Sequence, residues 1–155
     1  MIPVGTALDT VRVHEIGRKR VVKEIYYPKF MTPSNYEACM RPPNIEDGSS
    51  PGYGGLFSLT FTSILASSTL FDNLPCYKGP SLGTNFTLAC PYTLPAHYTE
   101  TVWAKEWGVE IGLVRISTGL EESEMLLGWF QGALEAAEIA CEKAELLVQF
   151  VEIKN

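Results

Sequence analysis

The spacing of apolar residues divides the chain into short strands and helices. Residues 21–27 are rich in β-branched and aromatic side chains, and Pro28 ends the run, so we predict a strand there. In residues 54–62, Leu56, Ser58 and Thr60 alternate with Phe57, Leu59 and Phe61, which is typical of a strand with one buried face. The same kind of pattern predicts further short strands around residues 76–77, 86–90 and 113–117.

Between these strands the apolar residues recur at helical spacing. Thr32 and Pro33 supply a helix start, and residues 36–40 are expected to form a short helix. Helices are also predicted over residues 63–74 and over residues 97–107, where Gly108 would close the helix. From Ser123 onward a long amphipathic helix is predicted. The acidic residues at its start suit the positive end of the helix dipole: Glu121, Glu122 and Glu124.

The order of these elements predicts the fold class. Strands and helices follow one another, and a loop rich in Gly, Pro and Asn fills residues 41–53. We therefore expect an α+β fold in which helices cover one face of a small, mainly antiparallel sheet, with a long C-terminal helix.

Composition and charge narrow the function classes. At 155 residues with 46% hydrophobic and 19% charged content, the chain is expected to fold as one ordinary domain. A net charge of −6 argues against a nucleic-acid partner, because the one basic cluster is Arg18-Lys19-Arg20. Residues 48–71 carry no charge, but they contain Pro51, glycines and many hydroxyls. This mixture favours a buried strand and helix over a membrane span.

The cysteines indicate neither a metal site nor a disulfide framework. Four of them are scattered without a CxxC pair or a neighbouring histidine: Cys39, Cys76, Cys90 and Cys141. The first 15 residues lack a basic stretch followed by an apolar one, so we predict no secretory signal. We expect reduced thiols, no metal and a cytoplasmic location.

Four sequence stretches, in this order and spacing, carry a family resemblance. They are YYPK at 26–29, GYGGLFS at 52–58, GPSLGTNFTL at 79–88, and VRIS with GLE at 114–121. From about Val21 to Ala137 the chain resembles the C-terminal domain of the Cys/Met-metabolism enzymes that use pyridoxal phosphate, in particular fungal-type cystathionine γ-synthase. The resemblance implies the small C-terminal domain of fold-type I pyridoxal-phosphate enzymes.

The resemblance implies a role for Arg115. In related enzymes the arginine of the RxSxGxE segment grips the α-carboxylate of the amino-acid substrate. A guanidinium fork matches a carboxylate with two parallel hydrogen bonds and keeps its charge at physiological pH. Arg115 also lies in an apolar strand, where an unpaired charge is costly. The alternative is a structural ion pair between Arg115 and an acid such as Glu121.

The resemblance also implies that Ser81, Leu82 and Gly83 line the same pocket and help to orient the substrate carboxylate. Gly83 suits a tight bend that brings the backbone close to a ligand. The alternative is an ordinary turn after Pro80. Many family members carry a glutamate where this chain has Phe86, which implies a different surrounding for the substrate side chain.

For the reaction, the resemblance implies transsulfuration in methionine biosynthesis, in which cysteine replaces the acyl group of O-acyl-homoserine. The family cofactor is pyridoxal phosphate, and its lysine anchor belongs to a large domain. No lysine of this chain stands in a segment like the family's lysine motif; Lys78 is the one nearest the expected pocket. We therefore predict no catalytic residue here, and a large domain that acts in cis or in trans.

The predicted organisation has two parts. Residues 1–20 depart from the family pattern and are interpreted as a remnant of the helix that links the two domains, while residues 21–155 form the C-terminal domain. The resemblance also implies a homo-oligomer. An alternative is a non-catalytic truncated paralogue that pairs with a family enzyme or with itself through an uncovered apolar face. A third is an unrelated small α+β binding domain.

Overall fold

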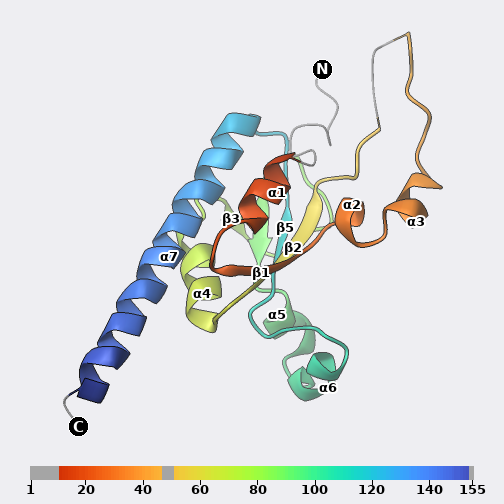
Figure 1. Ribbon diagram of the computed structural model, residues 1–155. Helices are drawn as coiled ribbons and strands as arrows, with labels where there is room; N and C mark the ends of the chain where they lie inside the picture. Colours follow the sequence, from red (N-terminus) through yellow and green to blue (C-terminus); the bar gives the residue numbers. More distant parts are fainter. Residues whose placement is uncertain (1–10, 47–50, 154–155) are drawn as a thin grey trace.

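The fold is built on one five-stranded sheet (Figure 1). The computed structural model describes residues 11–46 and 51–153. The strands lie in the order β1-β2-β5-β4-β3. Their bounds are β1 Val22–Tyr26, β2 Leu56–Phe61, β3 Tyr77–Lys78, β4 Leu88–Cys90 and β5 Val114–Ser117. All five strands were predicted from the pattern, to within three residues at their ends.

Strand β5 lies at the centre of the sheet and runs antiparallel to both of its neighbours, β2 and β4. Strands β1 and β2 are also antiparallel, whereas β3 pairs with β4 in parallel. The register places Arg115 of β5 between Ser58 of β2 and Cys90 of β4. The predicted α+β fold with a mainly antiparallel sheet is therefore confirmed.

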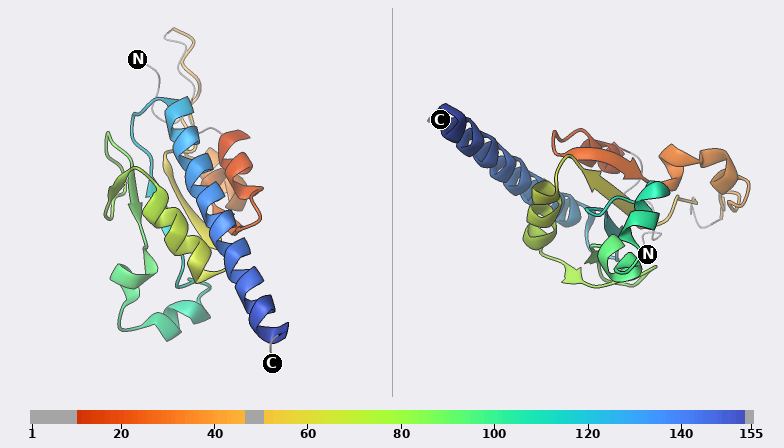
Figure 2. Two further views of the ribbon diagram at one scale, coloured as in Figure 1. Left: turned by 90° about the vertical axis from the view of Figure 1, so that its left-hand side faces the viewer. Right: turned by 90° about the horizontal axis from the view of Figure 1, so that it is seen from below.

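Helices cover one face of the sheet (Figure 2). In its left panel α7 runs between α1 and α4, and the strands lie behind them. The helices are α1 Val11–Gly17, α2 Pro28–Met31, α3 Pro33–Glu37, α4 Ile64–Asn73, α5 Thr93–His97, α6 Thr101–Glu106 and α7 Ser123–Ile153. The long C-terminal helix is thus confirmed.

The hydrophobic core lies between the sheet and this helical layer. Alternate residues of β2 and β5 point into it, including Phe57, Leu59 and Ile116, each at most 2% exposed. From α7 the core receives Phe130, whose ring centroid lies 5.8 Å from that of Phe57. Helix α7 contributes further apolar residues at helical spacing: Leu126, Ala133, Leu134 and Ala137.

Local sequence explains where the main helices begin. The Ser63 hydroxyl accepts a hydrogen bond from the Ala66 N–H at 3.1 Å and caps α4. At the start of α7 the Glu122 carboxylate accepts from the Met125 N–H at 3.0 Å. Both groups satisfy a donor that the first helical turn leaves without a backbone partner.

Two helix predictions need correction. The helix predicted over residues 97–107 is two helices, α5 and α6, separated by a turn in which the Glu100 N–H donates to the His97 carbonyl at 3.0 Å. Tyr98 and Thr99 have low helix propensity, which favours a break there. The predicted end at Gly108 is confirmed, since its φ is +78°. The helix start predicted at Thr32 and Pro33 is confirmed, since α3 begins at Pro33, but α3 ends at Glu37 and not at residue 40; α2 was not predicted.

The first and last parts of the chain bear on two predictions. Of the divergent segment 1–20, residues 1–10 lie outside the described residues, and the rest includes α1; the domain boundary at 21 stays a prediction. Helix α7 extends past α4 at its C-terminal end (Figure 1). Its last turns carry exposed apolar residues: Leu146, Leu147, Val148, Phe150 and Val151. Within the described part of the chain, none of the helices combines the length and apolar character needed to cross a membrane.

Candidate functional site

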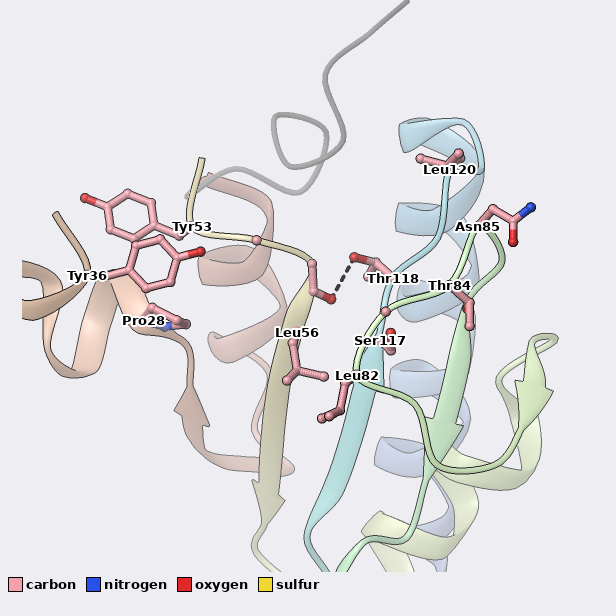
Figure 3. Close-up of a pocket in the computed structure, with 13 residues that line it drawn as sticks. Pro28, Tyr36, Tyr53, Leu56, Leu82, Thr84, Asn85, Ser117, Thr118 and Leu120 are labelled. Carbon is pink, nitrogen blue, oxygen red and sulfur yellow. Dashed lines mark hydrogen bonds between the residues drawn. The ribbon is translucent and has the colours of Figure 1, made fainter. Parts of the chain in front are cut away.

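A cavity of about 580 Å³ lies where the ends of β2 and β5 meet three loops. Figure 3 shows its two sides, with Tyr36 and Tyr53 on one and Leu82 and Leu120 on the other. Leu56 lies between them at the start of β2. The remaining lining residues are Pro28, Gly54, Gly55, Gly83, Thr84, Asn85, Ser117 and Thr118. The predicted site residues Leu82 and Gly83 therefore line this cavity.

The aromatic wall of the cavity is fixed by contacts among tyrosines. Tyr36 and Tyr53 stack with ring centroids 5.4 Å apart. The Tyr53 hydroxyl donates to the Glu37 carboxylate at 2.5 Å. The buried Tyr27 hydroxyl donates to the Gly54 carbonyl at 3.0 Å, and Gly54 has a φ of +79°, which a glycine adopts without strain. Neither Tyr36 nor Tyr53 was predicted as a site residue, although Tyr53 lies in the GYGGLFS stretch that carries the family resemblance.

The floor of the cavity is the end of β5, which is fixed to the start of β2. The N–H and the hydroxyl of Thr118 both donate to the Gly55 carbonyl, each at 2.8 Å (Figure 3). A Cβ on Gly55 would lie 2.3 Å from Thr118 Oγ1, so this close approach requires glycine. Ser117, the residue before Thr118, is buried and lines the cavity.

Arg115 does not line this cavity but lies on the same face of β5 as Ser117. Residues 114 and 116 point into the helical layer, so Arg115 and Ser117 point to the opposite face of the sheet. The guanidinium Cζ of Arg115 lies 4.3 Å from the centroid of the Tyr92 ring. Arg115 Nε is buried and has no hydrogen-bond partner among the described residues.

The alternative ion pair between Arg115 and Glu121 is wrong. The Glu121 carboxylate instead accepts from the Thr87 N–H at 2.6 Å and from the Thr87 hydroxyl at 2.7 Å. Burial is the largest single influence and would raise the pKa of Glu121. Hydrogen bonds from the Thr87 N–H and hydroxyl, together with the backbone N–H groups of Glu121 and Gly119, hold that pKa below its usual value. Within residues 11–46 and 51–153 no ion pair is formed by Arg115.

Ser81 turns toward its own loop. Its hydroxyl accepts a hydrogen bond from the Gly83 N–H at 3.0 Å. This contact is typical of an ordinary turn, which was the alternative interpretation of this segment. The turn leaves Leu82 78% exposed. A Cβ on Gly83 would meet no atom within 4 Å, so the loop is open on that side. Phe86 does not line the cavity; it packs against Tyr77, with ring centroids 5.2 Å apart.

Among the described residues, no lysine lines the cavity. Lys78 Nζ donates to the carbonyls of Leu74, at 2.8 Å, and Phe71, so its amine is already held by backbone. Lys29 lies over the Tyr53 ring, outside the cavity lining. Nor do any three His, Cys, Asp or Glu side chains in the described ranges gather as metal ligands would.

A small, mainly antiparallel sheet with helices on one face and a long C-terminal helix is the fold of the small domain of fold-type I pyridoxal-phosphate enzymes. Two solved structures share this fold. Cystathionine γ-synthase from Xanthomonas oryzae pv. oryzae, in complex with aminoacrylate and cysteine, has a TM-score of 0.66 at 23% identity over 83% of this chain and 33% of that one. Cystathionine γ-lyase from Lactobacillus plantarum, complexed with L-serine, has a TM-score of 0.65 at 20% identity over 81% and 32%.

Sequence relatives are closer. The cystathionine γ-synthase-like enzyme iboG2 of Amanita muscaria is 54% identical over an alignment of 141 residues that covers 85% of this chain and 22% of the relative. Cystathionine γ-synthase of Saccharomyces cerevisiae is 48% identical over 133 residues, 84% of this chain and 20% of the relative. No protein-family model matches the chain. The chain belongs to the cystathionine γ-synthase-like family, and it spans about a fifth of the length of these relatives.

Proposed function

We propose that this chain is the substrate-carboxylate-binding part of a cystathionine γ-synthase-like, pyridoxal-phosphate-dependent enzyme. The proposed reaction is γ-replacement, in which cysteine displaces the acyl group of O-acyl-homoserine. Arg115 binds the α-carboxylate on the open face of β5, and the loop of Ser81, Leu82 and Gly83 borders the neighbouring cavity, which Leu82 and Gly83 line. Relatives at 48–54% identity support the reaction class.

The observation that carries this proposal is the state of Arg115. Its Nε is buried and has no hydrogen-bond partner among the described residues. Glu121, the first acidic residue after β5, accepts hydrogen bonds from Thr87 instead. A buried donor without a partner is unfavourable, and an anion that reaches the guanidinium edge would satisfy it. A carboxylate fits this edge because its two oxygens match two parallel N–H groups. Tyr92 lies over one face of the guanidinium, so the ring does not occupy the edge that a carboxylate would contact.

The cofactor-bearing part of the enzyme lies in a different polypeptide segment under this proposal. No lysine lines the cavity, and the chain spans about a fifth of its relatives. We propose that a large domain, in cis or in trans, supplies the lysine and packs against the open face of the sheet. The cytoplasmic location, the homo-oligomer and the linker remnant in residues 1–20 belong to the same proposal and rest on the sequence.

Two measurements on the purified chain test this function. In the first, pyridoxal phosphate is added, the visible spectrum is recorded, and borohydride reduction is followed by peptide mapping. We expect no stoichiometric adduct at a single lysine. An adduct at Lys29 or Lys78 that is lost on addition of an amino-acid substrate would overturn the statement that the lysine comes from elsewhere.

The second measurement is an NMR titration with L-cystathionine, which the solved Xanthomonas oryzae cystathionine γ-synthase binds. We expect saturable shifts at the amides of Arg115 and Ser117. Arg115→Leu should abolish them, and Arg115→Lys should weaken binding because an ammonium lacks the planar fork. As a matched control, Arg41→Leu changes an exposed arginine outside the cavity lining and should leave the shifts intact. A wild-type chain that shows no saturable shift would contradict the carboxylate site.

One further observation favours the second candidate, a non-catalytic partner that pairs with itself. Five apolar residues at the projecting end of α7 are each 58–68% exposed: Leu146, Leu147, Val148, Phe150 and Val151. Such a patch tends to be covered by another surface. Sedimentation equilibrium of the wild type and of Leu147→Glu tests this. Self-association that the substitution abolishes would support pairing, and a wild-type monomer at micromolar concentration would exclude it.

A further inference from the structure

The two loops that border the cavity are joined to each other at Thr87. The backbone N–H and the hydroxyl of Thr87 each donate to the Glu121 carboxylate, and the same hydroxyl accepts from the Gly119 N–H at 3.0 Å. Thr87 is 2% exposed, so these bonds are shielded from water. The segment after β5 is thereby tied to the start of β4.

Two backbone contacts bring the same loops together. The Leu120 N–H donates to the Asn85 carbonyl at 3.1 Å. A Cβ on Gly119 would lie 2.4 Å from the Cα of Phe86 and 2.5 Å from its carbonyl carbon, so only glycine allows this approach. Asn85 and Leu120 both line the cavity. These contacts therefore fix the distance between the two segments that form this wall.

At this junction the side chain of Glu121, and not a backbone group, accepts the hydrogen bonds from Thr87. Its carboxylate takes two donors from one residue, and hydrogen bonds to a charged acceptor are stronger than neutral ones. On the other side, Thr118 fixes the same segment to Gly55 of the loop before β2. Residues 118–121 are thus held from both sides. Among the side chains at this junction, only that of Thr87 connects the loop of residues 81–85 to them.

We propose that Glu121 is a positioning residue that holds the loop of residues 81–85 against the end of β5 and so keeps Leu82 and Gly83 at the cavity. Through Thr87, Glu121 sets the distance between this loop and the strand that carries Arg115. The part of the proposal that concerns ligand affinity rests on the proposed function; the part that concerns the loop does not.

The first test follows amide hydrogen exchange in the full chain by NMR. Glu121→Ala removes both acceptors, and we expect exchange at residues 82–87 to become about 10- to 100-fold faster. Exchange in β1 and β2 should be unchanged. Glu122→Ala is the matched control, because Glu122 is the next residue and contacts Met125 instead of the loop. Exchange at 82–87 that rises equally in both variants, or in neither, would overturn the proposal.

Variants of Thr87 test the same contact from the other side and cover the case in which Glu121→Ala does not fold. Thr87→Val keeps the shape but removes the hydroxyl, so Glu121 loses one donor and Gly119 loses its acceptor. Thr87→Ser keeps the hydroxyl. We expect fast exchange at 82–87 in the valine variant and rescue to the wild-type rate in the serine variant. A serine variant as fast as the valine variant would overturn the role of the hydroxyl.

The final measurement separates this proposal from the proposed function. The L-cystathionine titration is repeated on Glu121→Gln and Glu122→Gln. We expect the dissociation constant to rise about 3- to 10-fold for Glu121→Gln alone, because glutamine retains one acceptor but loses the charge. Loosened exchange in a chain whose wild type binds no L-cystathionine would overturn the proposed function and leave the loop contact standing. If hydrogen exchange at residues 82–87 is unchanged in Glu121→Ala while the wild type binds L-cystathionine, the proposed function stands and the role of Glu121 is overturned.

Discussion

The guanidinium of Arg115 lies over the ring of Tyr92, with Cζ 4.3 Å from the ring centroid. Tyr92 follows β4, and its backbone N–H donates to the Leu113 carbonyl at 3.1 Å, so the ring is held beside the central strand. A cation over an aromatic face is stabilised by the ring quadrupole. The contact therefore orients Arg115 without neutralising it.

Replacing Tyr92 should weaken carboxylate binding without abolishing it. For Tyr92→Leu we expect the dissociation constant for L-cystathionine to rise about 2- to 5-fold, the equivalent of one cation–π contact. Tyr92→Phe keeps the ring and should bind like the wild type. Tyr98→Leu changes a tyrosine that is 80% exposed and serves as the control. Equal effects of the leucine and phenylalanine variants would show that the ring face does not orient Arg115.

Gly119 should be intolerant of any side chain. Gly119→Ala places a Cβ 2.4 Å from the backbone of Phe86, and we expect a loss of about 1–3 kcal/mol in the free energy of unfolding. Gly128→Ala is the matched control within α7, where a Cβ would meet nothing within 4 Å. It should gain about 0.5–1 kcal/mol from helix propensity. Urea unfolding of both variants measures the two changes, and a stable Gly119→Ala would refute the close approach.

Phe130 should be a main contributor to stability. It is 1% exposed and contacts Phe57 in the core, so Phe130→Ala leaves a cavity and should cost about 3–5 kcal/mol in the free energy of unfolding. Phe150→Ala removes the same atoms from a position on α7 that is 63% exposed. Its effect should stay within about 0.5 kcal/mol. Comparable losses in the two variants would contradict the burial of Phe130.

Glu121 should make the stability depend on pH. Its pKa in the folded chain lies below the ordinary value of 4.5: burial disfavours the ionised form, but the hydrogen bonds from Thr87 and from the backbone N–H groups of Glu121 and Gly119 together favour it more. The unfolded chain therefore binds the proton more readily, and the stabilisation is present above the ordinary pKa and lost as the pH falls through the folded pKa. Urea unfolding between pH 3 and 7 should show the wild type losing its advantage over Glu121→Gln toward acid. In a Thr87→Val background this difference should be smaller, and a difference independent of pH would refute the contact.

The pattern of the chain predicts the framework better than the site. Strand β2 shows alternation in which Phe57, Leu59 and Phe61 all enter the core, and α7 repeats apolar residues over many turns. These are local signals, and both elements were predicted correctly. The break between α5 and α6 was missed because His97 to Trp107 is continuous in helical spacing, whereas the turn at Glu100 depends on contacts between neighbouring residues.

The site could be predicted only where a family resemblance marks it. Leu82 and Gly83 were expected at a pocket and line the cavity. Glu121 was considered as a partner for Arg115, since the two are close in sequence, but its true partner Thr87 lies 34 residues away. Pairings over such distances depend on strand register, which no single segment reveals. Tyr92 and the Tyr36–Tyr53 wall carry no sequence signal of a site for the same reason.

The position of β5 at the middle of the sheet has a consequence for the order of folding. Strands β1 and β2 and helix α4 lie within the first half of the chain, but β4 has only the two-residue β3 as a neighbour until β5 arrives. Closing β2 onto β5 joins residues more than 50 positions apart, a step whose chain entropy slows folding. The same step places the end of β5, with Ser117 and Thr118, against Gly55 and Leu56 at the start of β2. The floor of the cavity is therefore expected to form late, so that a chain stalled before this step would lack the cavity.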